Sequence, residues 1–352
     1  METCRREGIL GRIDIFIPCY NYGRFLRQCV NSVLGHTGVD VRVLVIDDAS
    51  PDNTAEVAAD LARKDPRVTV IHHTKNKGHI NTYNEGIEWA SADYMLLLSA
   101  DDYLLPGALN RAADLMDAHP EVGFTFGNYI ELSDSGNQTP KIIIDTTNCS
   151  DRRILEGRGF IELNGADNLV ATCTAVVRTE LQKRLGGYRH ELPHSGDMEM
   201  WLRFAAHAPV GFISAYQGVY RRHSVNMSTS YCFVSEGHAT YTKNGRLGDL
   251  QQRKSALDCF FEHCKDVLLP REDLCRRLYR QLSESAMVHA HTAFNEGQTG
   301  ESKQLSDFAL AVCPEIRRSS AWAKLTCKRW MGARIWRAVR PAAVAIRAMQ
   351  RN

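Results

Sequence analysis

Apolar residues gather in short runs, separated by longer amphipathic stretches, through the first 130 residues. Short apolar runs are typical of buried strands, and apolar positions three and four residues apart are typical of helices. The runs predict strands at 13–17, 41–46, 68–71, 94–98 and 122–129. The amphipathic stretches predict helices at about 25–33, 54–64, 79–89 and 106–119. Alternating strands and helices favour an α/β fold with a Rossmann-like, mainly parallel sheet flanked by helices.

The pattern is less regular after residue 130. It predicts strands at 172–177 and 210–214 and a helix over about 197–207. The polar segment 224–247, rich in Ser and Thr, predicts a mobile loop. Leu and Phe residues at helical spacing then predict helices over 250–312. We therefore expect three parts, namely an α/β domain (1–230), a helical C-terminal extension (231–315) and a tail (316–352).

The tail is basic, because ten Lys and Arg residues and no Asp or Glu follow Glu315. Its apolar residues recur every three or four positions and would form one stripe along a helix. The stripe comprises Met331, Ile335, Val339, Ala342, Ile346 and Met349. Arginines lie on the other side, which is typical of a helix on an anionic membrane surface. Packing of this helix on the body of the protein is the alternative. We expect no nucleic-acid partner, since no aromatic platform accompanies the arginines.

Composition narrows the class of protein. The 352 residues are 44% apolar, which suits one large or two modest globular domains. Eleven cysteines include no CxxC pair, and no apolar stretch is long enough to span a bilayer. We therefore expect reduced thiols and a cytoplasmic protein, peripheral on the cytoplasmic face of an inner membrane. The absence of a GxGxxG or a GxxxxGK[ST] motif disfavours a dinucleotide site and a nucleoside triphosphate loop.

Acidic residues follow predicted strands or begin a predicted helix at three places: Asp47-Asp48, Asp101-Asp102 and Asp197. Parallel strands bring their carboxyl ends to one edge of a sheet, so these acids can share a crevice. Carboxylates there suit Mg²⁺ or Mn²⁺ and a substrate phosphate. Ordinary turns and helix caps are the alternative interpretation of any single acidic pair.

Five short motifs, taken in order, resemble glycosyltransferase family 2, whose members have the GT-A fold. They are Ile15-Phe16-Ile17-Pro18-Cys19-Tyr20-Asn21, Val45-Ile46-Asp47-Asp48-Ala49-Ser50, Lys77-Gly78, Ser99-Ala100-Asp101-Asp102 and Ser195-Gly196-Asp197-Met198-Glu199-Met200-Trp201. The resemblance covers about residues 12–225. It implies an inverting, metal-dependent transferase that uses a nucleotide-diphosphate sugar.

The resemblance also implies roles for single residues. It assigns the nucleotide-sugar donor to Pro18, Cys19, Tyr20, Asp48, Lys77, Gly78 and Asp101. It assigns the metal to Asp102, and it places His223 where related enzymes close over the diphosphate or metal. A structural role for His223 is the alternative, and Asp47 is expected to support its loop. Ser99 departs from the family pattern, in which another Asp is common.

On the acceptor side, the resemblance makes Asp197 the catalytic base and places Trp201 and Arg203 near the acceptor. Gly196 stands where the family commonly has Glu. The chemistry requires a cation to stabilise the leaving diphosphate and a carboxylate to take the proton of the attacking hydroxyl.

The expected function is transfer from a UDP-sugar to a glycan or lipid-linked acceptor in the synthesis of a cell-surface polysaccharide or lipopolysaccharide. One alternative is a non-catalytic subunit that binds nucleotide sugars and acts as a scaffold in a membrane-associated complex. Another is a nucleotidyltransferase, but the segment from Pro18 to Gly23 does not resemble a glycine-rich phosphate loop.

Overall fold

The computed structural model describes residues 10–145, 151–226, 232–235, 238–241, 245–268, 270–332 and 335–336. The chain forms two compact units. The described residues of the first unit lie in 10–164, 168–226 and 262–268, and those of the second lie in 165–167, 232–261 and 270–336. The three-part division expected from the sequence remains a prediction.

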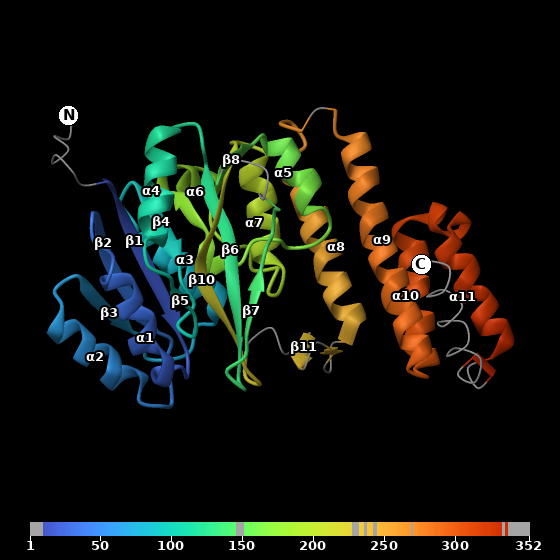
Figure 1. Ribbon diagram of the computed structural model, residues 1–352, viewed down its shortest axis with the longest axis horizontal. Helices are drawn as coiled ribbons and strands as arrows, with labels where there is room; N and C mark the ends of the chain where they lie inside the picture. Colours follow the sequence, from blue (N-terminus) through green and yellow to red (C-terminus); the bar gives the residue numbers. More distant parts are fainter. Residues whose placement is uncertain are drawn as a thin grey trace. The chain divides into compact units, whose positions relative to one another are not determined.

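The first unit is built on a ten-stranded mixed sheet (Figure 1) with the order β3-β2-β1-β4-β9-β6-β10-β5, in which β7 pairs with β6 and β8 with β10. Its strands are β1 (Leu10–Cys19), β2 (Val39–Asp47), β3 (Val68–His72), β4 (Tyr94–Leu97), β5 (Tyr103–Leu104), β6 (Phe124–Ser133), β7 (Gln138–Lys141), β8 (Arg152–Leu155), β9 (Val176–Arg178) and β10 (Val210–Arg222). The strands β3, β2, β1 and β4 are mutually parallel, as expected. Beyond them, β9 is antiparallel to both β4 and β6.

Helices of the first unit connect these strands. They are α1 (Gly23–Leu34), α2 (Thr54–Lys64), α3 (His79–Trp89), α4 (Ala108–Ala118), α5 (Gly157–Asn164), α6 (Thr179–Leu185) and α7 (Gly196–Ala205). Each predicted strand from 13 to 98 is followed by its predicted helix, so the alternation read from the sequence is confirmed in this part. The fold is the α/β class expected, with the acidic pairs Asp47-Asp48 and Asp101-Asp102 at or beyond the carboxyl ends of β2 and β4.

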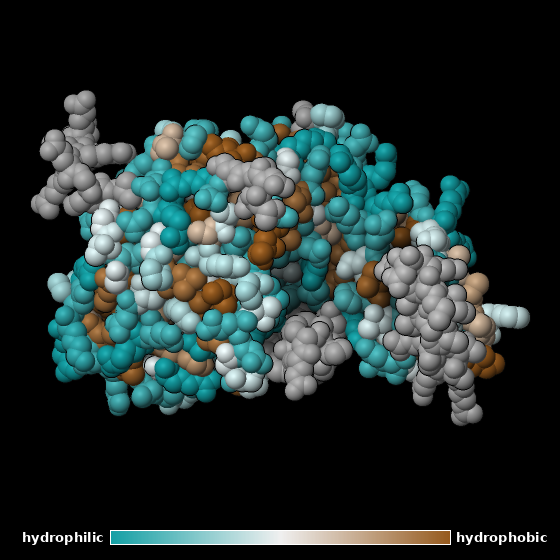
Figure 2. Space-filling view, viewed as in Figure 1, coloured by the Kyte–Doolittle hydropathy of each residue, from teal (hydrophilic) through white to brown (hydrophobic). Residues whose placement is uncertain are grey.

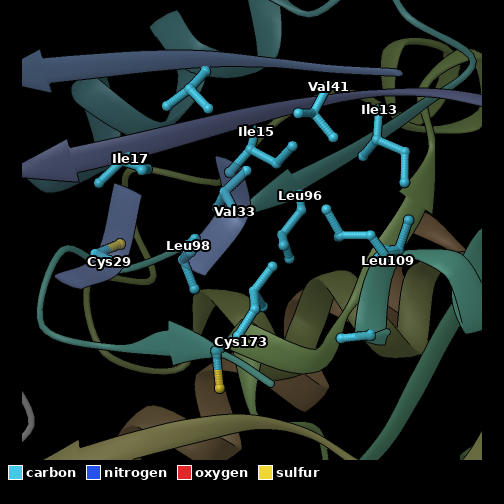
Figure 3. Close-up of a cluster of buried hydrophobic side chains, with 14 of the residues drawn as sticks. Ile13, Ile15, Ile17, Cys29, Val33, Val41, Leu96, Leu98, Leu109 and Cys173 are labelled. Atoms are coloured by element: carbon cyan, nitrogen blue, oxygen red, sulfur yellow. The ribbon is translucent and has the colours of Figure 1, made fainter. Parts of the chain in front are cut away.

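Both faces of β1 are covered, which explains its continuous apolar run. Figure 3 shows Ile13, Ile15 and Ile17 on one face, packed in a cluster with Val33 of α1 and Leu96 beside them. On the other face, Phe16 lies against α3. A Cβ at Gly86 of α3 would come within 2.2 Å of the Phe16 ring, so glycine allows this close approach.

Two sequence predictions were wrong. Residues 172–177, predicted as a strand, begin with a 3₁₀ turn, η1 (Thr172–Thr174), and only then enter β9. The Thr174 hydroxyl donates to the Ala171 carbonyl (2.8 Å), a local bond that competes with strand pairing. Part of the loop predicted at 224–247 forms a hairpin of β11 (Cys232–Ser235) and β12 (His238–Tyr241), whose β-prone residues explain the pairing.

The second unit is mainly helical after residue 244. Its helices are α8 (Gly245–His263, which ends in the first unit), α9 (Glu272–Asn295), α10 (Thr299–Val312), η3 (Pro314–Arg318) and α11 (Ser320–Met331). Leu274, Leu278 and Leu282 are buried along α9, which confirms the helical spacing read there. Most of the predicted tail helix lies outside the described residues, which end at Trp336.

Most of the described surface in Figure 2 is hydrophilic, and apolar residues appear there in separate patches. Among the described helices, none combines the length and the apolar character that crossing a membrane requires.

Candidate active site

The loops after β1 and β2 are joined to each other at the edge of the sheet. The Asp48 amide donates to the Cys19 carbonyl (2.9 Å), and the Asn21 amide donates to the Ser50 hydroxyl (2.9 Å). Asn21 and Ala49 have left-handed backbone conformations, with φ of 61° and 59°. Such conformations cost energy in residues other than glycine and cluster at functional sites. The surrounding hydrogen bonds therefore hold this edge in a defined shape.

Asp48 organises the segment that leads into α3. Its carboxylate accepts hydrogen bonds from the amides of Lys77 (2.7 Å) and Gly78 (3.0 Å) and from Nδ1 of His73 (2.7 Å). Burial raises the pKa of Asp48, but these hydrogen bonds outweigh burial and leave the pKa below its usual value. The structure thus brings together three predicted donor-binding residues, Asp48, Lys77 and Gly78. The Lys77 ammonium itself pairs with Glu85 (2.9 Å).

The neighbouring predicted residues differ in exposure. Asp47 accepts a hydrogen bond from the Ser50 amide (3.0 Å), in keeping with support of its own loop. Of the segment Pro18-Cys19-Tyr20, only Tyr20 is largely exposed (49%). Burial raises the pKa of the Cys19 thiol to about 12, so this side chain is a neutral thiol.

Asp101 and Asp102 are both buried beyond the end of β4. Oδ1 of Asp102 accepts a hydrogen bond from the Arg221 amide (2.8 Å), while Oδ2 of Asp101 accepts bonds from His223 (3.1 Å) and Asn226 (3.0 Å). Burial, followed by the charge of Asp101, raises the pKa of Asp102 well above its ordinary value. The remaining oxygen of each carboxylate makes no hydrogen bond within the described chain.

These two carboxylates fit a divalent cation. A nearby positive charge would reverse the cost of ionising Asp102, and carboxylate oxygens are the ligands that Mg²⁺ prefers. No cluster of three His, Cys, Asp or Glu side chains is arranged for a metal in the part of the chain described. Mg²⁺ sites for phosphate substrates commonly take one or two carboxylates, with water and phosphate oxygens as further ligands.

His223 bonds to Asp101 and not to Asp102, the residue that the sequence analysis expects to bind the metal. Its Nε2 bonds to Asp101, and its ring stacks on Phe25 (centroids 5.2 Å apart) with Tyr22 edge-on (5.4 Å). Nδ1 of His223 is buried and has no hydrogen-bond partner among the described residues. That nitrogen is the ring atom available to a ligand, and metal binding by His223 stays a prediction.

Asp197 is the second residue of α7. Its Oδ2 accepts a hydrogen bond from Asn168 (2.7 Å), and its Oδ1 accepts one from the Met198 amide (2.8 Å). Burial raises the pKa of Asp197, and the Met198 amide, the charge of His194 and the Asn168 amide oppose that rise. A carboxylate with a raised pKa is a stronger proton acceptor once ionised.

Tyr83 on α3 links the two acidic groups. Burial raises the pKa of its phenol, and the charges of Asp101, Asp197 and Asp102 raise it further. The charges of all three carboxylates thus act on one phenol, which indicates that they lie near this side chain. The sequence analysis did not single out Tyr83 or Asn168, and the position of Tyr83 on the helix after Lys77-Gly78 was the available signal.

Trp201 and Arg203 do not face this site. Trp201 stacks on Phe124 (centroids 5.2 Å apart), and both residues are buried. The Arg203 guanidinium bonds to both oxygens of Glu199 (3.1 and 3.2 Å) and to the carbonyls of Gly186 (3.0 Å) and Gly187 (2.9 Å). These contacts disfavour direct contact of either side chain with an acceptor. The acceptor-side role of Trp201 and Arg203 stays a prediction, in which they would act by supporting α7.

Comparison with known proteins identifies the family. The model of the family described as "Glycosyl transferase family 2" matches residues 14–185. A Mycobacterium tuberculosis protein named "Uncharacterized protein MT1568" is 30% identical over 224 residues, which cover 62% of this chain and 69% of that protein. This chain belongs to glycosyltransferase family 2.

Other relatives of this glycosyltransferase agree. The "Uncharacterized glycosyltransferase EpsJ" of Bacillus subtilis is 30% identical over 128 residues, covering 36% of this chain and 37% of that protein. A crystal structure of residues 1–349 of S. aureus TarS aligns with a TM-score of 0.52 and 14% identity, covering 87% of this chain and 91% of that one. This structural likeness confirms the GT-A fold. The protein is therefore a glycosyltransferase, as the motifs predicted.

Proposed function

We propose that this glycosyltransferase moves a sugar from a nucleotide-diphosphate sugar, with UDP as the expected nucleotide, to a hydroxyl of a glycan or lipid-linked acceptor. Direct displacement would invert the configuration at the anomeric carbon. The observation that supports this most is that the charges of Asp101, Asp102 and Asp197 all raise the pKa of the buried Tyr83 phenol. The carboxylates proposed to hold the cation and the carboxylate proposed as the base would thus lie near the same side chain.

On the donor side, the loop ordered by Asp48 would receive the nucleotide. The exposed ring of Tyr20 and the backbone of Lys77-Gly78 lie at this edge of the sheet. Asp102 would hold Mg²⁺ or Mn²⁺, with Asp101 and Nδ1 of His223 beside it. The cation would supply Lewis-acid stabilisation of the charge that develops on the diphosphate.

On the acceptor side, Asp197 would take the proton of the attacking hydroxyl, which is general-base catalysis worth about 10²–10⁴-fold. Asn168 and the Met198 amide fix the orientation of its two oxygens. The burial that raises the pKa of Asp197 would make the ionised carboxylate more basic than a solvated one.

The test is binding and turnover of UDP-, GDP- and dTDP-sugars, with and without Mn²⁺, in wild type and Asp197→Asn. Calorimetry measures donor binding. The release of free sugar measures turnover, as slow transfer of the sugar to water. We expect Mn²⁺-dependent binding of one donor, with turnover lost and binding kept in Asp197→Asn. Binding without turnover in wild type, even with acceptor glycans, would favour the scaffold alternative. Pyrophosphate release from a nucleoside triphosphate would favour the nucleotidyltransferase.

We further propose that the basic tail binds an anionic membrane surface, on the cytoplasmic face of an inner membrane, where lipid-linked acceptors of polysaccharide synthesis are found. Within the described part of the tail, Trp330 and Ile335 are 89% and 59% exposed. Trp336, by contrast, donates to Asn295 of α9 (2.8 Å). An outward Trp beside basic residues suits the interface between lipid headgroups and acyl chains.

Vesicle sedimentation tests the membrane proposal. Wild type should sediment with vesicles of phosphatidylglycerol and not with vesicles of phosphatidylcholine alone. Deletion of residues 316–352 should abolish sedimentation, and Trp330→Ala should weaken it. Equal sedimentation of the wild type and the deletion variant would contradict the proposal and favour a tail packed on the protein.

A further inference from the structure

The segment between α6 and α7, residues 186–195, leads directly into the helix that carries Asp197. It is bound on one side by α7 itself, because Arg203 donates to the carbonyls of Gly186 and Gly187. Its other side lies on α3, the helix that begins at the donor-binding loop. The position of Asp197 therefore depends on how this segment is held.

Asn84 of α3 makes the central contact. Its Nδ2 donates to the Tyr188 carbonyl (2.9 Å), and its Oδ1 accepts from the Tyr188 amide (2.7 Å). One side-chain amide thus satisfies both backbone groups of Tyr188, as a neighbouring strand would. This pair of bonds fixes the distance between α3 and the segment 186–195 and also the register of the segment along the helix.

Gly187 shows how closely the two elements fit. A Cβ at this position would lie 2.2 Å from Oδ1 and 2.9 Å from Cγ of Asn84. The residue is not among the described glycines with a left-handed backbone, so its conformation alone does not require glycine. The close approach of Asn84 is the reason for glycine here.

Further contacts run along the same interface. Nε2 of His79 donates to the Pro193 carbonyl (3.0 Å), and the rings of Tyr83 and Tyr188 pack edge to face (centroids 5.1 Å apart). Tyr188 in turn lies beside Gly196, where a Cβ would be 3.3 Å from its ring. At the start of α3, Gly78 precedes His79, the first residue of the helix, and donates its amide to Asp48.

From these contacts we infer that Asn84 is a positioning residue, which fixes Asp197 relative to the donor site through its paired bonds to Tyr188 and its close fit to Gly187. The inference rests on the proposed role of Asp197 as the base. It adds that α3 connects the two halves of the site, with the donor loop at its first turn and the base-bearing segment on its side.

Asn84→Ala, Gly187→Ala and the double variant test this inference. Asn84→Ala removes the paired bonds, and Gly187→Ala pushes Asn84 away. We expect each to lower kcat about 10-fold or more, which corresponds to about 1.4 kcal/mol in activation free energy. The donor Kd should stay within about 2-fold of wild type. In the double variant the Gly187→Ala effect should nearly vanish, since the atoms it displaces are gone. Glu88→Ala, an exposed residue of the same helix, is the control and should match wild type.

Hydrogen exchange provides a readout independent of turnover. We expect faster amide exchange in residues 186–196 of both single variants, with the strands of the sheet unchanged. Unchanged exchange, unchanged kcat, or multiplicative losses in the double variant would overturn the inference. The Asp197→Asn variant in the same assay separates the two ideas. If Asp197→Asn retains turnover, the proposed base is wrong, whereas loss in Asp197→Asn without loss in Asn84→Ala refutes the positioning role alone.

Discussion

Asn168 donates a hydrogen bond of 2.7 Å from Nδ2 to Oδ2 of Asp197. The bond stabilises the ionised form of the carboxylate, and it opposes the rise in pKa that burial causes. Asn168, an exposed loop residue, thus influences both the orientation of the Asp197 carboxylate and its affinity for a proton.

Removal of this bond should change the pH dependence of transfer. In Asn168→Ala the pKa of Asp197 should rise, because a group that stabilises the charged form is lost. Since the base acts when ionised, the acidic limb of kcat against pH should move to higher pH, with activity better preserved at alkaline pH. Asn168→Asp should move it further by adding a like charge. A uniform loss at every pH would contradict this account and indicate misplacement of the base.

Asp48 should control donor affinity. Asp48→Asn keeps the shape of the side chain but replaces a carboxylate that accepts three hydrogen bonds. Hydrogen bonds to charged groups contribute about 1.5–3 kcal/mol, so we expect donor Kd to rise about 10–100-fold. Calorimetric titration measures this, with Asp65→Asn, beyond the end of α2, as the control. An unchanged Kd would show that the loop does not contact the donor.

Asp102 should destabilise the metal-free protein at neutral pH. Its folded-state pKa lies above the unfolded value, so the folded state holds the proton more tightly. The contribution of Asp102 to the free energy of unfolding is therefore greatest at low pH and falls as pH rises from its unfolded pKa through its folded one. At pH 7, Asp102→Asn should melt above wild type without metal, and Mn²⁺ should raise Tm in wild type alone. A variant that melts lower at every pH would refute this.

Gly86 should be essential for packing of α3. In Gly86→Ala the new Cβ would lie 2.2 Å from the ring of Phe16 on β1. Forcing an extra methyl group into a packed core costs about 1–3 kcal/mol, which urea unfolding measures. Gly159→Ala in α5 is a matched control, because its Cβ would meet nothing within 4 Å. That helical substitution should be neutral or stabilising by up to about 1 kcal/mol.

The sequence was informative where one local pattern determines the structure. Apolar runs that end in acids placed Asp47-Asp48 and Asp101-Asp102 at strand ends, because burial and parallel pairing are visible in short windows. Pairings between distant segments had no such signal. The bond of His223 to Asp101, at 122 positions' separation, and the bonds of Asn84 to Tyr188 depend on the packing of whole elements. Trp201 likewise belongs to a recognisable motif, but its stacking on Phe124 depends on how distant segments pack in the core.

Asp48 and Asp102, at the nucleotide end and the metal end of the proposed donor site, differ in how far the protein itself stabilises their charge. The carboxylate of Asp48 already accepts three hydrogen bonds from the protein, so the nucleotide end is preorganised and binding there requires little rearrangement. The carboxylate of Asp102 is buried beside a like charge and holds its proton tightly. A cation that binds there competes with that proton. Donor binding with Mn²⁺ should therefore release acid into solution, and its measured heat should depend on the ionisation enthalpy of the buffer, whereas the nucleotide end should contribute no such dependence.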